Sequence, residues 1–175
     1  MFHRSMPPGL LMIHAGIVAF VGAVVLAVLF AVRGGARIFA ATVSGLVFLL
    51  LLYLFIIAPG QVYVAVENTL KVNAPPYARM DVPWEEISEA YVADWSARSE
   101  IAPVQKTNAI ATRAYRVGWF TLRNGRRALI VAEGTRVLYL ETANISLLLA
   151  PDDFDGFAEA VKERLSAIER RVTLD

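Results

Sequence analysis

The sequence predicts an α+β protein in which a two-helix transmembrane hairpin precedes a β-rich domain with a single C-terminal helix. Residues 10–32 and 38–58 contain no Asp, Glu, Lys or Arg, which is typical of helices in lipid. Residues 60–150 contain short β-branched and aromatic runs separated by turn residues, and residues 152–171 show helical periodicity. Apolar residues make up 57% of the chain, against roughly 45–50% in a soluble domain.

The two uncharged segments predict a membrane hairpin, which we assign to residues 1–59. Each is close to the ~20 residues that cross a ~30 Å hydrocarbon layer as a helix. The first is longer than the ~7–15-residue core of a signal peptide, and a second apolar segment follows it at once, which favours an anchor. Residues 33–37, RGGAR, supply two glycines for a sharp reversal, so both ends of the hairpin are expected on one side of the membrane. The flanking basic residues nearly balance and favour the cytoplasm only slightly for the domain at residues 60–175.

Small residues recur at intervals of four along both predicted helices. The set is Ala15, Ala19, Ala23, Ala27, Ala41 and Gly45. Small side chains let helix backbones approach closely in lipid, where packing drives association. We expect them to pack the two helices together, because a tethered partner has the higher effective concentration; the alternative is a dimer interface. The one ionisable residue of the two helices, His14, is expected near the membrane surface, and the alternative is a proton path.

Strand patterns begin directly after the second helix, at residues 62–68, and continue at residues 70–73, 78–82 and 88–95. Residues 96–113 have weak periodicity and are expected to form a long loop. The β domain is therefore expected to start at the bilayer surface without a flexible linker.

Residues 114–132 predict a β-hairpin around Asn124 and Gly125, the strongest short signal for a type I′ turn. In that register Arg123 faces Arg126 across the strands. Three arginines would gather at the tip: Arg123, Arg126 and Arg127. We interpret this arginine tip as solvated, and the alternative is contact with an anion or an acidic partner.

A second hairpin is expected to turn at Gly134, and a further strand is expected in ISLLLAP at residues 145–151. The period then changes, because apolar residues recur at intervals of 3, 4, 4 and 3 in residues 152–171. They are Phe154, Phe157, Val161, Leu165 and Ile168. This pattern predicts a helix with one apolar face, started by an Asp152 or Asp153 cap and packed on an open end of the sheet.

The chain lacks the residues that most catalysis and metal binding need. It has no cysteine, and its two histidines, His3 and His14, lie outside the β domain. A net charge of +1 is not the basic balance of a nucleic-acid-binding protein. The three carboxylates of PDDFD, residues 151–155, could hold a cation, but a helix start explains them with fewer assumptions. We therefore expect no enzyme activity, no metal, no cofactor and no nucleic-acid partner.

Several motifs of the β domain resemble the bacterial pleckstrin-homology-like families. They are the PWEEI turn at residues 83–87, a Tyr-x-x-Gly-x-Phe pattern at Tyr115, Gly118 and Phe120, the Asn-Gly turn, and the PDDFxxF start of the last helix. The resemblance covers about residues 60–168. It implies a partly open antiparallel β-barrel of about seven strands, with the C-terminal helix at one end.

The resemblance also implies an interaction module of a bacterial cell membrane, with peptide or protein contact along the sheet edges and the barrel mouth. Eukaryotic relatives bind phosphoinositides through basic residues of the first strand-to-strand loop. Here that loop, residues 67–69, is ENT with only Lys71 nearby, which argues against this ligand. The expected partners are membrane lipid and either another membrane protein or a second copy of the chain. The alternatives are an anionic-lipid sensor that uses the arginine tip, and an accessory subunit of a membrane enzyme or transporter.

Overall fold

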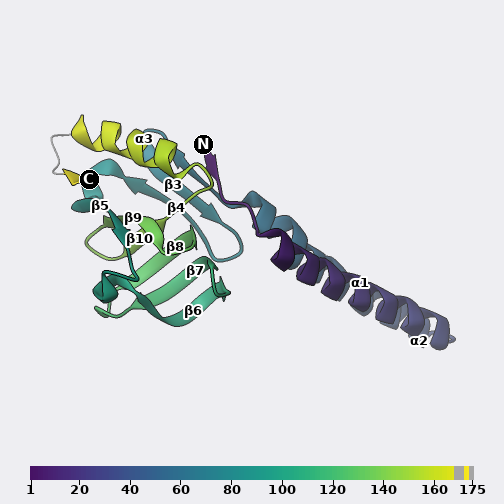
Figure 1. The fold of residues 1–175 in the computed structure, drawn as a ribbon. Coiled ribbons are helices and arrows are strands. Elements are labelled where there is room, and N and C mark those ends of the chain that lie inside the picture. Colours follow the sequence, from purple (N-terminus) through teal and green to yellow (C-terminus); the bar gives the residue numbers. More distant parts are fainter. Residues whose placement is uncertain (168–171, 174–175) are drawn as a thin grey trace. The chain divides into compact units, whose positions relative to one another are not determined.

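The computed structural model describes residues 1–167 and 172–173, which form two compact units. The helical hairpin is Met6–Gly60, and the β unit consists of Met1–Ser5 together with the chain from Gln61 onwards (Figure 1). The first five residues, which the expected boundary at residue 59 assigns to the hairpin, therefore pack with the β unit.

Two long apolar helices make up the hairpin. Helix α1 is Pro8–Ala31, and α2 is Ala36–Leu52, continued by a π-helical turn at Tyr53–Ile57 and a 3-10 turn at Ala58–Gln61. Both are long and apolar enough to cross a membrane, by length and composition, with a mean hydropathy of 2.6 in each. Only 11% and 0% of their apolar windows are buried, whereas the core helix of a soluble protein is mostly buried. Gly34, with φ 69°, provides the reversal between the helices.

Among the described residues, β1 to β4 form one antiparallel sheet in the order β1-β2-β3-β4. Their bounds are Phe2–His3, Tyr63–Val66, Thr69–Ala74 and Ala78–Pro83. The strands predicted at residues 62–68, 70–73 and 78–82 are confirmed as β2, β3 and β4. No local pattern indicates β1, because two residues are too few to show a strand period.

In the part of the chain that the structure describes, a larger sheet has the order β11-β5-β9-β10-β8-β7-β6. Its strands are β5 Glu89–Asp94, β6 Pro103–Ala111, β7 Tyr115–Leu122, β8 Arg127–Glu133, β9 Arg136–Glu141, β10 Ser146–Leu149 and β11 Val172–Thr173. The α+β fold class is confirmed. The two sheets are not closed into a barrel, however, and β10 pairs parallel with β8 and β11 parallel with β5.

The second hairpin expected at Gly134 is wrong, because β8 and β9 do not pair with each other. Strand β10 lies between them, antiparallel to β9 and parallel to β8. All four residues of β10 are buried, and a strand buried on both faces is stable only inside a sheet. Gly134 has the positive φ of a turn residue, 80°, but its amide donates to Ala114 O at 3.0 Å.

The loop expected at residues 96–113 is also wrong, because it contains β6, an edge strand of the larger sheet. Most of β6 is exposed, and its pairing with β7 is irregular between Pro103 and Gln105 and between Lys106 and Asn108. Irregular pairing and a lysine such as Lys106 protect an edge strand from aggregation. Polar residues at positions 105–108 leave no apolar alternation from which a strand could be predicted.

The predicted β7–β8 hairpin forms, but its loop has three residues instead of two. Gly125 N donates to Leu122 O at 2.9 Å, and Thr121 pairs with Arg127. A left-handed glycine, φ 82° at Gly125, closes this longer loop. The register therefore differs by one residue from the prediction.

Helix α3, Phe154–Ser166, confirms the predicted C-terminal helix. The side chain of Asp153 caps it by accepting a hydrogen bond from Gly156 N at 3.1 Å. The predicted apolar face is buried at Phe157, Val161 and Leu165. Ile168 and the rest of the predicted helix end, residues 168–171, lie outside the described residues.

Alkaline pH is expected to destabilise the β unit through its buried tyrosines. Tyr115 is 1% exposed, and burial raises the pKa of its phenol to about 12; burial also raises the pKa of Tyr139. The folded state then holds the phenolic proton more tightly than the unfolded chain, where the pKa is about 10, so stability falls as pH rises from about 10 to 12. The unfolding midpoint, followed by circular dichroism, should decrease over this range. Tyr115→Phe should flatten the decrease, and an unchanged slope would contradict the assignment.

Candidate functional site

The arginine tip divides into one internally bonded arginine and two exposed ones. The guanidinium of Arg126 donates to Thr142 O at 2.6 Å and to Ser146 Oγ at 3.0 Å. It also lies 3.5 Å from a carboxylate oxygen of Glu141, and the residue is half buried. These contacts join the β7–β8 hairpin to the chain around β10. Arg126 therefore has a structural role and is not free to bind an external anion.

Arg123 and Arg127 remain exposed at the tip. The guanidinium carbon of Arg127 lies 4.1 Å from the centroid of the Trp119 ring, a cation–π arrangement. The indole N–H of Trp119 donates to Tyr77 O at 3.0 Å, which holds the ring in place. The two exposed arginines can therefore meet an anion without losing an internal hydrogen bond.

A buried tyrosine extends the Arg126 network. The hydroxyl of Tyr139 donates to Glu141 Oε2 at 2.7 Å and lies 2.9 Å from Ser146 Oγ. Burial first, and then the hydrogen bond to Glu141, raise the pKa of this phenol. The sequence does not reveal the network, because its members come from the end of the β7–β8 loop, from β9 and from β10, and meet only through strand order.

Arg126→Gln is expected to lower the free energy of unfolding by about 1–2 kcal/mol, because it removes hydrogen bonds from Thr142 O and Ser146 Oγ in a partly buried site. The matched change Arg123→Gln should cost no more than about 0.5 kcal/mol, since it removes an exposed side chain. Thermal unfolding of the two variants in the same detergent checks both values. Equal losses would show that Arg126 is not the structural member of the tip.

A second charged cluster, centred on Arg4, joins the N-terminal segment to two other parts of the β unit. The Arg4 guanidinium pairs with Glu133 at 2.5 Å and with Asp152 at 3.0 Å, and it donates to Ala150 O at 3.0 Å. The Arg4 side chain is only 12% exposed, whereas those of Glu133 and Asp152 are 38% and 42% exposed, so solvent screens these interactions in part. In the sequence, Arg4 is an isolated base 129 residues from Glu133, and nothing local signals the pair.

The backbone of the same segment continues the smaller sheet. Phe2 pairs with Val64 across β1 and β2, and Arg4 N donates to Val62 O at 3.0 Å. The chain thus enters the helical hairpin from β1 and returns from it into β2. Because β1 and β2 are adjacent strands, the chain leaves the β unit and returns to it at neighbouring strands of one sheet.

Residues at and near the start of α3 also bind the N-terminal segment, residues 2–5. Asp152 N donates to His3 O at 2.9 Å, and the Asp152 carboxylate accepts from Ser5 N at 3.0 Å. The Phe2 ring lies edge-on to Phe157, with 5.5 Å between centroids. The N-terminal segment is therefore bonded through backbone, ring and charge.

Within the hairpin, the small residues take two different positions. The half-buried members are Ala41 and Gly45, whereas Ala15, Ala19, Ala23 and Ala27 are exposed. The buried and half-buried residues of α1 are instead spaced mainly by three and four residues: Leu10, His14, Val18, Val21, Gly22, Val25, Val28 and Leu29.

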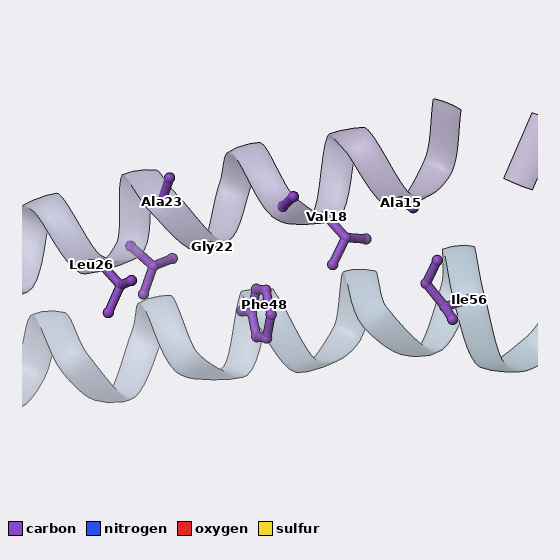
Figure 2. Close-up of a pocket in the computed structure, with 9 residues that line it drawn as sticks. Ala15, Val18, Gly22, Ala23, Leu26, Phe48 and Ile56 are labelled. Atoms are coloured by element: carbon purple, nitrogen blue, oxygen red, sulfur yellow. The ribbon is translucent and has the colours of Figure 1, made fainter. Parts of the chain in front are cut away.

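An apolar hollow of about 650 Å³ is lined by residues of both helices. Figure 2 shows Phe48 of α2 in this region, and its ring lies next to Gly22 of α1. A Cβ atom at Gly22 would come within 3.1 Å of the Phe48 ring, so glycine permits this close approach. The exposed alanines Ala15, Ala19 and Ala23 line the hollow, which leaves an apolar surface open beside the helix seam.

His14 has a structural partner in the hairpin. Its Nδ1 lies 3.2 Å from Phe55 O, and since a carbonyl can only accept, the ring nitrogen donates. Phe55 belongs to the π-helical turn, and its ring lies 4.9 Å from the imidazole. His14 is 7% exposed and fastens this irregular turn to α1.

The carboxylates of PDDFD each have a partner within the β unit. Asp152 binds Arg4, Asp153 caps α3, and Asp155 lies 3.2 Å from Arg136. Over residues 1–167 and 172–173, no three His, Asp or Glu side chains gather closely enough to hold a metal ion.

Comparison with known proteins identifies the β unit. A family model described as "Bacterial PH domain" matches residues 61–165, more than half of the chain. The matched segment begins at the last residue of the 3-10 turn after α2 and ends within α3. Neither a curated protein nor a solved structure matches the chain.

Proposed function

Because the chain belongs to the bacterial PH domain family, whose domains are generally non-catalytic modules that bind lipids or proteins, we propose that it is a membrane-anchored interaction module. The two apolar helices cross the membrane as a hairpin. The β unit stays at the bilayer surface, on the cytoplasmic side, and binds another membrane protein or a second copy of the chain. Any catalysis belongs to the partner.

The attachment of both hairpin ends to adjacent strands is the observation that carries this proposal. A single flexible linker would let the β unit tumble away from the membrane. Here the chain enters the hairpin from β1 and returns into β2, and Arg4 ties the entry to Glu133 and Asp152. Such a double connection is useful for a module that must present its surface to a partner in the same membrane.

The open surface of the hairpin supports self-association as one form of this interaction. Its exposed alanines allow close backbone approach by another helix in lipid. Two copies with different C-terminal tags, co-expressed and extracted in mild detergent, should purify together. Ala19→Phe should weaken this association, while Phe20→Leu on the same turn should not.

The general proposal is tested by loosening both connections. Flexible Gly/Ser spacers after Ser5 and after Pro59 should reduce in-membrane cross-linking of the full chain to its partner copies or partner proteins, while the unfolding midpoint of the β unit stays close to wild type. Cross-linking that persists unchanged with both spacers would show that fixed presentation is not needed. A chain recovered in the aqueous fraction after cell breakage would refute the membrane anchor.

The second candidate function is sensing of anionic lipid through the exposed cations Arg123 and Arg127. Their freedom from internal hydrogen bonds favours it over a role for Arg126. Nanodiscs that contain anionic lipid should bring the tip closer to the bilayer, measured by a fluorescent label at Asn124. Salt and the double change Arg123→Glu with Arg127→Glu should both abolish the approach. Indifference to salt would rule it out.

A further inference from the structure

The outer face of the smaller sheet has a polar hollow that none of the functions above uses. Its volume is about 130 Å³, and it is lined by Tyr63, Lys71, Val72, Asn73, Arg79 and Asp81 from β2, β3 and β4. The strand register explains the arrangement. Tyr63, Asn73 and Arg79 form one cross-strand row, and Lys71 and Asp81 are neighbours in the next row.

The charges of this hollow are only partly satisfied by the protein. Lys71 donates to Glu67 at 2.6 Å, and this hydrogen bond raises the pKa of Lys71 and lowers that of Glu67. Within the described chain, the side chains of Arg79 and Asp81 have no hydrogen bond or ion pair. The hollow therefore presents a cation and an anion, two residues apart on β4, that have no hydrogen bond or ion pair within the described chain, although Lys71 lies across the strands from Asp81 and is attracted by it.

The hollow also lies close in the chain to the end of the second apolar helix. That helix extends to Gln61, and Tyr63 follows two positions later, so the backbone separating them spans at most about 7 Å. Asn73 Nδ2 donates to Gln61 O at 2.7 Å, so one residue that lines the hollow is bonded to the residue at which the β unit resumes after the hairpin. In a membrane-anchored chain this position is at the level of lipid headgroups.

We propose that the hollow binds the headgroup of a zwitterionic phospholipid with a primary ammonium, of the phosphatidylethanolamine class. Arg79, with the hydroxyl of Tyr63 and the amide of Asn73, binds the phosphodiester. The Asp81 carboxylate accepts hydrogen bonds from the ammonium group. The proposal rests on the membrane anchor of the proposed function.

Charge and shape favour this headgroup over its competitors. A headgroup that is only anionic, such as phosphatidylglycerol, leaves Asp81 unpaired and is repelled by it. A quaternary ammonium has no N–H to donate and is typically held in a cage of several aromatic rings, whereas this hollow has one aromatic ring, that of Tyr63. The two-carbon ethanolamine link suits cationic and anionic side chains two residues apart on one strand, about 6.8 Å.

Native mass spectrometry of the full chain in mild detergent tests the proposal. The protein is mixed separately with phosphatidylethanolamine, phosphatidylcholine and phosphatidylglycerol, and the retained lipid is measured. Wild type should retain phosphatidylethanolamine preferentially. Arg79→Gln and Asp81→Asn should each reduce this retention about tenfold, the loss expected for one hydrogen bond to a charged group. The matched controls Arg113→Gln and Glu159→Gln change exposed charges elsewhere on the β unit and should retain it as wild type does.

Three results would overturn the proposal. One is equal retention by the test and control variants. Another is a preference for phosphatidylglycerol that Asp81→Asn increases, which would identify a simple anion site. The third is binding of soluble glycerophosphoethanolamine with the same dependence on Arg79 and Asp81 but no retention of lipid, which would identify a soluble ligand. Any of these with the chain still in the membrane fraction leaves the anchored module intact, whereas recovery in the aqueous fraction defeats both.

Discussion

Gly118→Ala should lower the free energy of unfolding of the β unit by about 3 kcal/mol, because the position is closed to a side chain in two ways. Its φ of 124° is a conformation that L residues rarely adopt. A Cβ atom there would also lie 2.5 Å from Asn108 O and 2.6 Å from Ala109 Cα, on the neighbouring strand β6. Both contacts are backbone atoms, so relief requires β6 to move away from β7.

The three tryptophans, Trp84, Trp95 and Trp119, all belong to the β unit, so thermal unfolding followed by their fluorescence measures the effect there. Gly125→Ala is the matched control. Gly125 also has a positive φ, 82°, but a Cβ atom would meet nothing within 4 Å, so only the backbone cost of about 1 kcal/mol is expected. If Gly118→Ala and Gly125→Ala lower the free energy of unfolding equally, a side chain at residue 118 does not clash with β6.

Arg4→Ala is expected to destabilise the β unit by about 2 kcal/mol, because it leaves the Glu133 and Asp152 carboxylates and Ala150 O without their shared donor in a partly buried site. The second consequence is local. Once Arg4 is lost, β1 should detach from β2 more often. The amide of Asp152, which donates to His3 O, should then exchange with solvent faster by hydrogen–deuterium exchange.

Two further variants separate the charge cluster from a general effect. Arg33→Ala removes an exposed arginine of the helical turn and should leave both stability and Asp152 exchange unchanged. Glu133→Gln combined with Arg4→Ala should cost less than the sum of the single changes, because the two residues share one interaction. Full additivity would mean that the Arg4–Glu133 pair does not contribute.

Local patterns predict those elements of this fold that bury one face. The intervals of Phe157, Val161 and Leu165 predict α3, and the alternation along residues 70–73 predicts β3. These periods arise because one side of each element meets the core. The length and apolar character of α1 and α2 are likewise direct properties of the sequence.

Local sequence patterns do not predict elements whose position depends on residues far away in the chain. Strand β10 enters between β8 and β9, an order that no local pattern specifies. Strand β6 is an exposed edge and has no apolar alternation, and β1 is two residues long. The loop between β7 and β8 has an Asn-Gly pair that suits two-residue and three-residue loops, and the register follows from that choice.

The candidate sites also combine features that local sequence shows with contacts that only the folded chain shows. The sequence shows that arginines gather at the predicted tip, but only the strand order shows that Arg126 bonds to Ser146 while Arg123 and Arg127 face solvent. The hollow at Arg79 and Asp81 requires three strands in register, and Arg4 requires a partner 129 residues away. Resemblance to a family supplied the fold, and it carries no information about these contacts.

The pairing of β1 with β2 has a consequence for the continuity of the chain. The segment before α1 and the segment after α2 belong to the same sheet, and Arg4 adds ion pairs to Glu133 and Asp152. If the chain were cut in the turn at residues 33–37, the N-terminal fragment would still be held by the β unit through β1 and Arg4. The two fragments should therefore purify together without a peptide bond between them.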